Sequence, residues 1–208
     1  MADIDGDDQL TRGAPPHLVD IVHRIEANER LDRAAALVER LSQPLDEPQL
    51  KRMLSGAWLG HALHPLLTDF PLGAWMSATL LDLFGGRRSR PAAQGLVAFG
   101  VATAVPTVAS GLVEWRRTAP PERRVGVVHA VINGTAATCY ARSMIPRARG
   151  RGFRAAGWSV AGGLIATVGG YLGGHLSIAR KVGSRDVELS APASGNGRRQ
   201  TGAAFTGS

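Results

Sequence analysis

Histidine is the residue type in this chain whose chemistry most directly suggests a site. Two of the six histidines, His17 and His23, lie in a polar N-terminal region. The other four lie beside the ends of long apolar stretches: His61, His64, His129 and His175. Neutral imidazole is the commonest protein ligand for transition metals and also serves as an axial ligand of haem iron. These four residues are therefore candidate ligands.

Four apolar stretches have about the length that a membrane-spanning helix needs. They cover residues 66–84, 92–113, 125–141 and 155–179, and the third is the shortest. A helix crosses ~30 Å of hydrocarbon with ~20 mostly apolar residues. The last three stretches contain no charged residue and lack the polar stripe of a soluble amphipathic helix. The sequence therefore predicts an all-α fold, an integral-membrane four-helix up-down bundle.

In an up-down bundle, the four histidines would gather at one membrane face. The first and third spans start on the side of both chain termini, and the second and fourth spans end there. Three more polar residues are expected near this face: Asp69, Glu114 and Asn133. Asn133 follows His129 by four residues, so both lie on the same side of one helix. The topology thus predicts one polar cluster from residues that are scattered along the sequence.

Ionisable side chains within a membrane are costly, and by default they face the protein interior and suggest a function. We therefore predict a site for haem b or a transition metal, with three cofactor-binding residues: His64, His129 and His175. For a metal ion, the predicted ligand set is wider: His61, His64, Asp69, His129 and His175. Three further residues are expected to surround and orient these ligands without binding the cofactor or metal themselves: Asn133, Glu114 and Tyr171. Such a site would serve membrane electron transfer with a redox protein as partner.

Two other functions are compatible with the same residues. In the first, the protein is non-catalytic, and the histidine cluster is an internal hydrogen-bond network that holds the helices together and docks a partner. In the second, the cluster begins a proton or metal-ion path. A path is disfavoured because the deep positions of the last three spans lack charges, and Asp82 alone marks the opposite side. No nucleophile elbow or acid–base pair supports an enzyme.

Composition excludes several other classes. The chain has 24 Lys and Arg residues against 17 Asp and Glu residues, a net charge of +7. The arginines flank the apolar stretches instead of gathering on one helix among stacking aromatics, so they indicate a lipid bilayer and not a nucleic acid as partner. The single cysteine, Cys139, excludes a disulfide scaffold, a Cys-based zinc site and a Cys-ligated iron–sulfur cluster within this chain.

Three regions are expected. Residues 1–53 form a helical N-terminal region, in which apolar residues recur at helical spacing between residues 16 and 43. Residues 54–182 form the four-span domain, and residues 183–208 a disordered tail. The acidic N-terminus lacks an apolar core for a cleaved signal peptide, so a multi-pass protein of the inner (plasma) membrane is expected. Basic residues that flank the apolar stretches number nine on the side of the termini and eight on the opposite side. This difference does not decide the orientation. We expect both termini in the cytoplasm.

The sequence also resembles a known family. The run WLGHALHPLLTDFPLGAW at residues 58–75 resembles the signature of a family of predicted four-span bacterial membrane proteins, domain of unknown function 2231. Residues 128–133 and 169–176 resemble its third and fourth segments, so the resemblance covers about residues 54–182. Ala62 departs from the family's pattern, which more usually has proline there. Some relatives continue into a Rieske-type iron–sulfur domain, which implies a redox setting, but no Cys-x-His pair follows here.

Overall fold

The computed structural model describes residues 16–183, and every regular element within that range is helical. Three short helices come first: α1 (Pro16–Ala27), α2 (Asp32–Leu41) and α3 (Pro48–Ser55). Four long helices follow: α4 (Leu63–Phe84), α5 (Arg90–Trp115), α6 (Pro120–Ala148) and α7 (Gly152–Gly174). The all-α prediction is confirmed for residues 16–183. The tail expected from residue 184 onwards lies outside the described residues.

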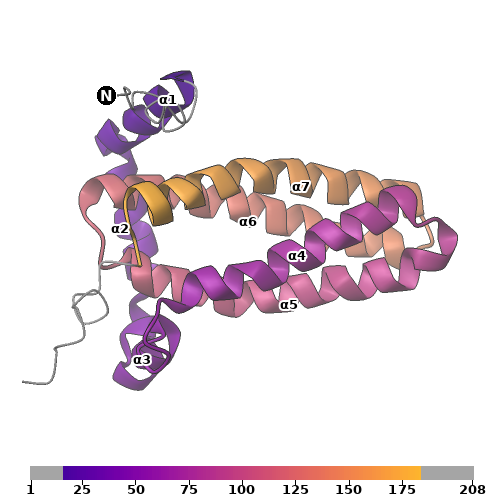
Figure 1. Ribbon diagram of the computed structural model, residues 1–208, viewed down its shortest axis with the longest axis horizontal. Coiled ribbons are helices and arrows are strands. Elements are labelled where there is room, and N and C mark those ends of the chain that lie inside the picture. Colours follow the sequence, from indigo (N-terminus) through magenta and orange to yellow (C-terminus); the bar gives the residue numbers. More distant parts are fainter. Residues whose placement is uncertain (1–15, 184–208) are drawn as a thin grey trace, which may run out of the picture.

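The four long helices lie side by side, and the three short helices gather at one end of them (Figure 1). α4 packs most extensively on α5, and α6 on α7, so the long helices form two hairpins; α4 also contacts α7, and α5 contacts α6. Gly86 and Gly150, both at positive φ, lie in the turns within the two hairpins, at the end away from α1–α3. Only glycine adopts this backbone conformation at little cost. At the other end, α1 and α2 contact α6, while α3 contacts α5.

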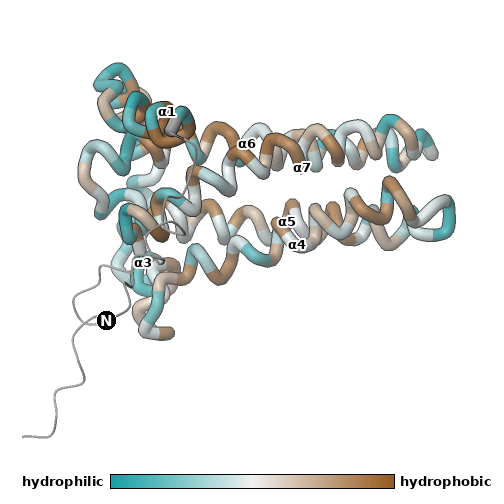
Figure 2. The backbone as a smooth tube through the Cα atoms, turned by 45° about the horizontal axis from the view of Figure 1, so that its top comes forward, coloured by the Kyte–Doolittle hydropathy of each residue, from teal (hydrophilic) through white to brown (hydrophobic). Residues whose placement is uncertain are grey.

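Within residues 16–183, two stretches are long and apolar enough to cross a membrane: Arg87–Trp115, which contains α5, and Gly152–Ala179. The second stretch continues from α7 through a π-helical turn, η4 (His175–Ala179). The other two expected spans lie in α4 and α6, where polar residues lower the hydropathy. Judged by length and composition alone, two of the four expected spans could therefore cross a membrane. Hydrophilic residues gather in α1–α3 and at the far turns (Figure 2).

The third expected span, shortest in the sequence, lies in the longest helix. α6 contains 29 residues because it continues beyond the apolar stretch into charged residues at both ends. Its N-terminus starts with two prolines, Pro120 and Pro121, whose fixed φ suits a first helical turn and whose missing N–H is not needed there. The uncharged stretch at residues 125–141 is therefore shorter than the helix, because the charged residues on either side of it are also helical.

A proline inside α4 is compensated by α5. Pro71 has no N–H to donate to the carbonyl of Leu67, its partner four residues earlier. The hydroxyl of Thr107 in α5 lies 3.1 Å from this carbonyl and shares its hydrogen between it and the carbonyl of Thr103 at 2.8 Å. The freed backbone acceptor is thereby satisfied without water, which is what a helix surrounded by other helices requires.

Aromatic side chains fill the centre of the four long helices. Trp75 of α4 stacks on Tyr140 of α6, with ring centroids 4.7 Å apart and planes 7° apart. Glycines on the neighbouring helices provide the space: Gly100 of α5 faces Trp75, and Gly162 of α7 faces Tyr140. The Tyr140 hydroxyl lies 3.0 Å from the Thr79 hydroxyl. Small residues on α5 and α7 thus allow large residues on α4 and α6 to meet.

Substituting Gly162 with alanine should destabilise the protein. A Cβ at this position would lie 2.8 Å from Cε2 of Tyr140, and overpacking of this kind costs about 1–3 kcal/mol. Gly157 on the same helix is the matched control, because a Cβ there meets nothing within 4 Å. Gly157→Ala should instead gain up to about 1 kcal/mol from helix propensity. Thermal unfolding in detergent measures both variants; equal effects would contradict this account of the core.

Candidate functional site

Two histidines from different hairpins form the centre of the site. His64 lies in the first turn of α4, and its Nδ1 is 2.9 Å from the carbonyl oxygen of Thr107 in α5. His129 lies in α6, and its Nδ1 is 3.0 Å from the carbonyl oxygen of Gly169 in α7. Each hairpin therefore contributes one histidine, held by the second helix of that hairpin.

These hydrogen bonds determine the tautomer of both rings. A carbonyl oxygen only accepts, so Nδ1 must carry the hydrogen in His64 and in His129. Nε2 is then the unprotonated nitrogen of both rings, and in His129 it lies 3.4 Å from Nδ2 of Asn133, which can donate to it. A backbone carbonyl bonded to one ring nitrogen is the usual arrangement that orients an imidazole for ligation through the other. Both histidines thus have the tautomer that ligates through Nε2.

Glycines on α5 and α7 lie directly against the two rings. A Cβ at Gly111 would be 2.8 Å from Cε1 of His64, and a Cβ at Gly173 would be 3.0 Å from Cε1 of His129. Any larger residue at these positions would displace the imidazoles. Gly111 and Gly173 therefore provide the space that the two rings occupy.

Two of the predicted supporting residues lie beside this pair. Oε1 of Glu114, near the end of α5, accepts a hydrogen bond from the backbone N–H of His64 at 3.1 Å. Nδ2 of Asn133 donates to the backbone oxygen of His129 at 2.9 Å and lies near its ring. Glu114 thereby caps the first turn of α4, and Asn133 fills the space next to Gly169.

The structure does not bring the remaining predicted residues to the pair. Nε2 of His175 lies 2.9 Å from Oε1 of Glu26 in α1. His61 is exposed before α4, and its ring bonds the adjacent Gly60 carbonyl. Asp69 and Tyr171 are exposed on the outer sides of α4 and α7. Within residues 16–183, no three His, Cys, Asp or Glu side chains gather in a way that could hold a metal ion.

The two hairpins repeat one pattern of residues. His64 and His129 are 65 positions apart, and so are two further pairs that meet between α4 and α6: Trp75 with Tyr140, and Asp82 with Arg147. Four buried residues of α4 have buried counterparts in α6 at this same spacing: Pro71, Ala74, Trp75 and Ala78 match Ala136, Cys139, Tyr140 and Ser143. Three close-packed positions of α5 recur 62 positions later in α7: Gly100 with Gly162, Thr107 with Gly169, and Gly111 with Gly173. The histidines therefore occupy equivalent places in an internal repeat.

A buried ion pair occupies the opposite end of the same interior. Arg147 of α6 forms a two-pronged contact with the carboxylate of Asp82 in α4. Their side chains are only 5% and 6% exposed. Arg147 also donates to the hydroxyl of Ser159 in α7 at 2.9 Å. From the sequence alone, Asp82 is the only polar residue expected to mark that side of the membrane. Its spacing of 65 residues from Arg147, the same as between His64 and His129, is the sequence signal that could have predicted the ion pair.

An ionic contact fixes α1 to the long helices. Glu26 of α1 accepts hydrogen bonds from Arg180 at 2.8 Å and from His175 at 2.9 Å. Burial raises the pKa of Glu26, but the hydrogen bonds from Arg180 and His175 outweigh that effect and hold its pKa below the ordinary 4.5. The ionised carboxylate is therefore the form that binds α1 to the end of α7.

Acidification should release α1. Because docking lowers the pKa of Glu26, the contact is fully stabilising above the ordinary pKa near 4.5 and is lost as the pH falls through the lowered value. Glu26→Gln should reduce the hydrogen-exchange protection of the α1 amides about tenfold or more at pH 7, since a charge-assisted hydrogen bond contributes about 1.5–3 kcal/mol. Asp20→Asn, an exposed change on α1, is the control. Equal protection in the Glu26 variant would contradict the contact.

Comparison with known proteins gives one match. The family model described as "Predicted membrane protein (DUF2231)" matches residues 60–186, which is more than half of the chain. This range contains all four long helices and both histidines of the pair. Neither the search of curated proteins nor the search of solved structures returned a match.

Proposed function

The chain belongs to the DUF2231 family of predicted membrane proteins, and on that premise we propose that it binds haem b between His64 and His129 and takes part in membrane electron transfer. α4–α7 would cross the inner membrane as a four-helix up-down bundle, with both termini in the cytoplasm. A redox protein would be the partner with which electrons are exchanged.

The packing of α4 supports a membrane-spanning position despite its two acidic residues. The charge of Asp82 is paired inside with Arg147. The outer side of α4 is largely apolar, with large exposed side chains at Leu66, Phe70, Met76, Leu80 and Leu83. Asp69 is the exposed exception, and it lies in the second turn, close to the end that we place at the membrane face.

α6 also has a surface that hydrocarbon can accommodate. Its exposed hydroxyls do not need water, because Thr135 donates to the carbonyl of Val131 and Thr138 to that of Gly134, each at 2.8 Å. Backbone-bonded threonines of this kind satisfy their polar groups within the helix. The polar residues His129, Asn133 and Arg147 face other helices instead.

The observation that carries the haem proposal is the matched orientation of the two histidines. Both rings donate from Nδ1 to a carbonyl, so that Nε2 carries the lone pair in each. Two histidines from facing helices would hold a haem iron through one ring nitrogen each, whereas a structural zinc site needs four protein ligands and a catalytic one three. The bound haem would supply one-electron chemistry, and the chain would hold and orient it.

An absorption spectrum of detergent-purified protein from its native host tests the proposal. A Soret band, sharp bands after reduction with dithionite and one haem per chain are expected. Metal analysis of the same sample covers the alternative: stoichiometric zinc, copper or iron without those bands would assign the pair to a metal ion. A folded protein with neither signal would overturn both assignments.

A second candidate is an internal hydrogen-bond network that stabilises the bundle and docks a partner. It is favoured by the fact that both imidazoles and the Glu114 carboxylate already have hydrogen-bond partners inside the protein. It predicts no chromophore, and it predicts loss of folding when His129 or Asn133 is replaced. The haem proposal predicts a folded protein without chromophore in the first of these variants.

A further inference from the structure

We propose that a cavity at the α1–α3 end binds the headgroup of an aminophospholipid, with its ammonium group deep inside and its phosphate near the mouth. The proposal uses the membrane placement of α4–α7 described above, since it puts this cavity at the level of lipid headgroups. It does not depend on whether His64 and His129 hold a haem.

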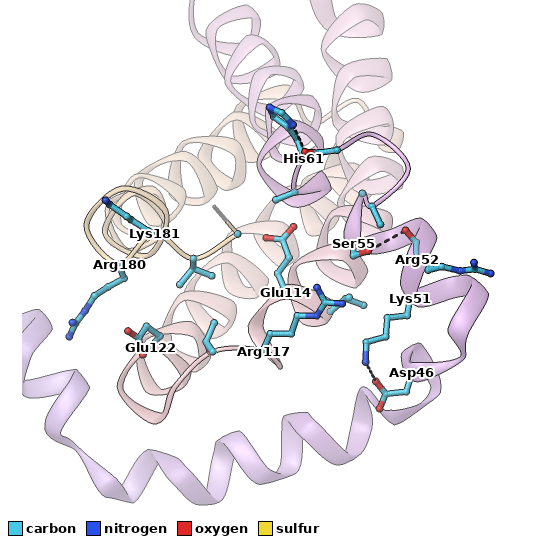
Figure 3. A pocket seen from close by; sticks show the side chains of 18 of the residues that line it. Asp46, Lys51, Arg52, Ser55, His61, Glu114, Arg117, Glu122, Arg180 and Lys181 are labelled. Atoms are coloured by element: carbon cyan, nitrogen blue, oxygen red, sulfur yellow. Dashed lines mark hydrogen bonds and ion pairs between the residues drawn. The ribbon is translucent and has the colours of Figure 1, made fainter. Parts of the chain in front are cut away.

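The cavity has a volume of about 1130 Å³ and lies between α3, the end of α5, the start of α6 and residues 180–183. Figure 3 shows its lining, with Glu114 pointing into the centre and Arg117 beside it. α5 forms the membrane-capable stretch that ends at Trp115. The cavity therefore opens where that stretch ends, at the boundary between hydrocarbon and water.

A buried carboxylate in the cavity wall requires a donor. Glu122 is 6% exposed, and its Oε2 has no hydrogen-bond partner within the described residues. Glu114 contributes a second carboxylate to the lining, and one of its oxygens already accepts from His64. A buried polar atom without a partner is unfavourable, and a charge more so. A primary ammonium group offers three N–H donors and a positive charge, which is what these carboxylates accept.

Arginines at the same cavity can bind the opposite charge. Arg52 of α3 and Arg117 of the α5–α6 connection line it, and both are exposed. Guanidinium groups bind phosphate oxygens with charge-assisted hydrogen bonds. Lys51 is engaged with Asp46, and Arg180 with Glu26. Lys181 also lines the cavity and is engaged in contacts of its own. The cavity thus combines the buried Glu122 and the half-buried Glu114 with exposed basic groups, which matches an ammonium and a phosphate on one ligand.

An adjoining apolar hollow indicates that the ligand is a lipid. This hollow has a volume of about 470 Å³ and is lined by Arg52, Met53, Ala57 and Trp58, so it shares Arg52 and Ala57 with the larger cavity. Met53 is 54% and Trp58 69% exposed. A small soluble zwitterion would leave this apolar surface uncovered. The glycerol and acyl part of a lipid would cover it while the headgroup occupies the polar cavity.

Native mass spectrometry of the full chain released from bilayer discs tests this assignment. The discs contain equal amounts of phosphatidylethanolamine, phosphatidylcholine and phosphatidylglycerol. Phosphatidylethanolamine should be retained at least fivefold over the other two, because choline has no N–H to donate and the glycerol headgroup has no cation. Equal retention of the three lipids, or preference for another lipid, overturns the proposal.

Two variants and a competitor sharpen the test. Glu122→Gln should remove the preference for phosphatidylethanolamine, whereas Glu29→Gln, an exposed carboxylate on η1 (Glu29–Leu31), should keep it. If Glu122→Gln does not fold, Arg117→Gln tests the phosphate end and should lower phosphatidylethanolamine retention at least threefold. Soluble phosphoethanolamine that displaces the lipid at micromolar concentration would show that the ligand is the free zwitterion. The absorption spectrum of Glu122→Gln should equal that of the wild type, so failure here is distinguishable from failure of the haem proposal.

Discussion

Replacing His129 with alanine is expected to abolish the Soret band of the purified protein while the chain remains inserted in the membrane. The variant removes one of the two ring nitrogens available to the iron, and its counterpart His64 cannot supply both positions. His64→Ala should give the same result, since the two histidines have equivalent surroundings. His23→Ala, an exposed change on α1, is the control and should retain the full haem content.

Imidazole added to His129→Ala distinguishes a ligand from a structural residue. The vacated space beside Gly173 is large enough for the lost ring, so free imidazole should restore the Soret band. A histidine that only holds the helices together would not give a spectroscopic response to imidazole. An unchanged spectrum in His129→Ala before any addition would remove His129 from the assignment.

The second large effect is expected at the end of the four long helices that lies away from α1–α3. Arg147→Met should lower the free energy of unfolding by about 3–5 kcal/mol, because it leaves the carboxylate of Asp82 buried without its countercharge. The double variant Asp82→Leu with Arg147→Met should recover most of that loss, since a buried ion pair replaced by apolar side chains is often neutral. Unfolding in mixed detergent micelles measures both.

Arg149→Met provides the matched control for this experiment. Arg149 is exposed two residues after Arg147, at the end of α6, and its loss should change the stability by less than about 0.5 kcal/mol. If Arg147→Met and Arg149→Met were equally stable, the ion pair would contribute nothing to the fold.

Much of the helical framework could be predicted from the sequence, because apolarity and proline or glycine positions are local signals. The predicted span at residues 155–179 corresponds closely to α7 and η4. The spacing of four residues between His129 and Asn133 correctly placed both on one side of α6. α3 was not predicted, because only eight residues make up the helix from Pro48 to its end at Ser55.

The partners of the histidines could not be predicted, because they are backbone atoms or belong to distant helices. The carbonyls of Thr107 and Gly169 carry no side-chain signal. His175 was grouped with His64 and His129 on its depth in the bundle alone. Its position next to Glu26 depends on where α1 docks, which the spacing of residues within α7 does not determine.

The contact between Glu26 and Arg180 also determines when the N-terminal region can acquire its final position during synthesis. The two residues are 154 positions apart, so a ribosome that adds about 5–20 residues per second needs roughly 8–30 s to produce the second after the first. During that time α1 has neither its ionic partner nor the end of α7 to contact. The contact of α1 with α6 can form earlier, but the ionic contact that completes its docking forms only after Arg180 has been made.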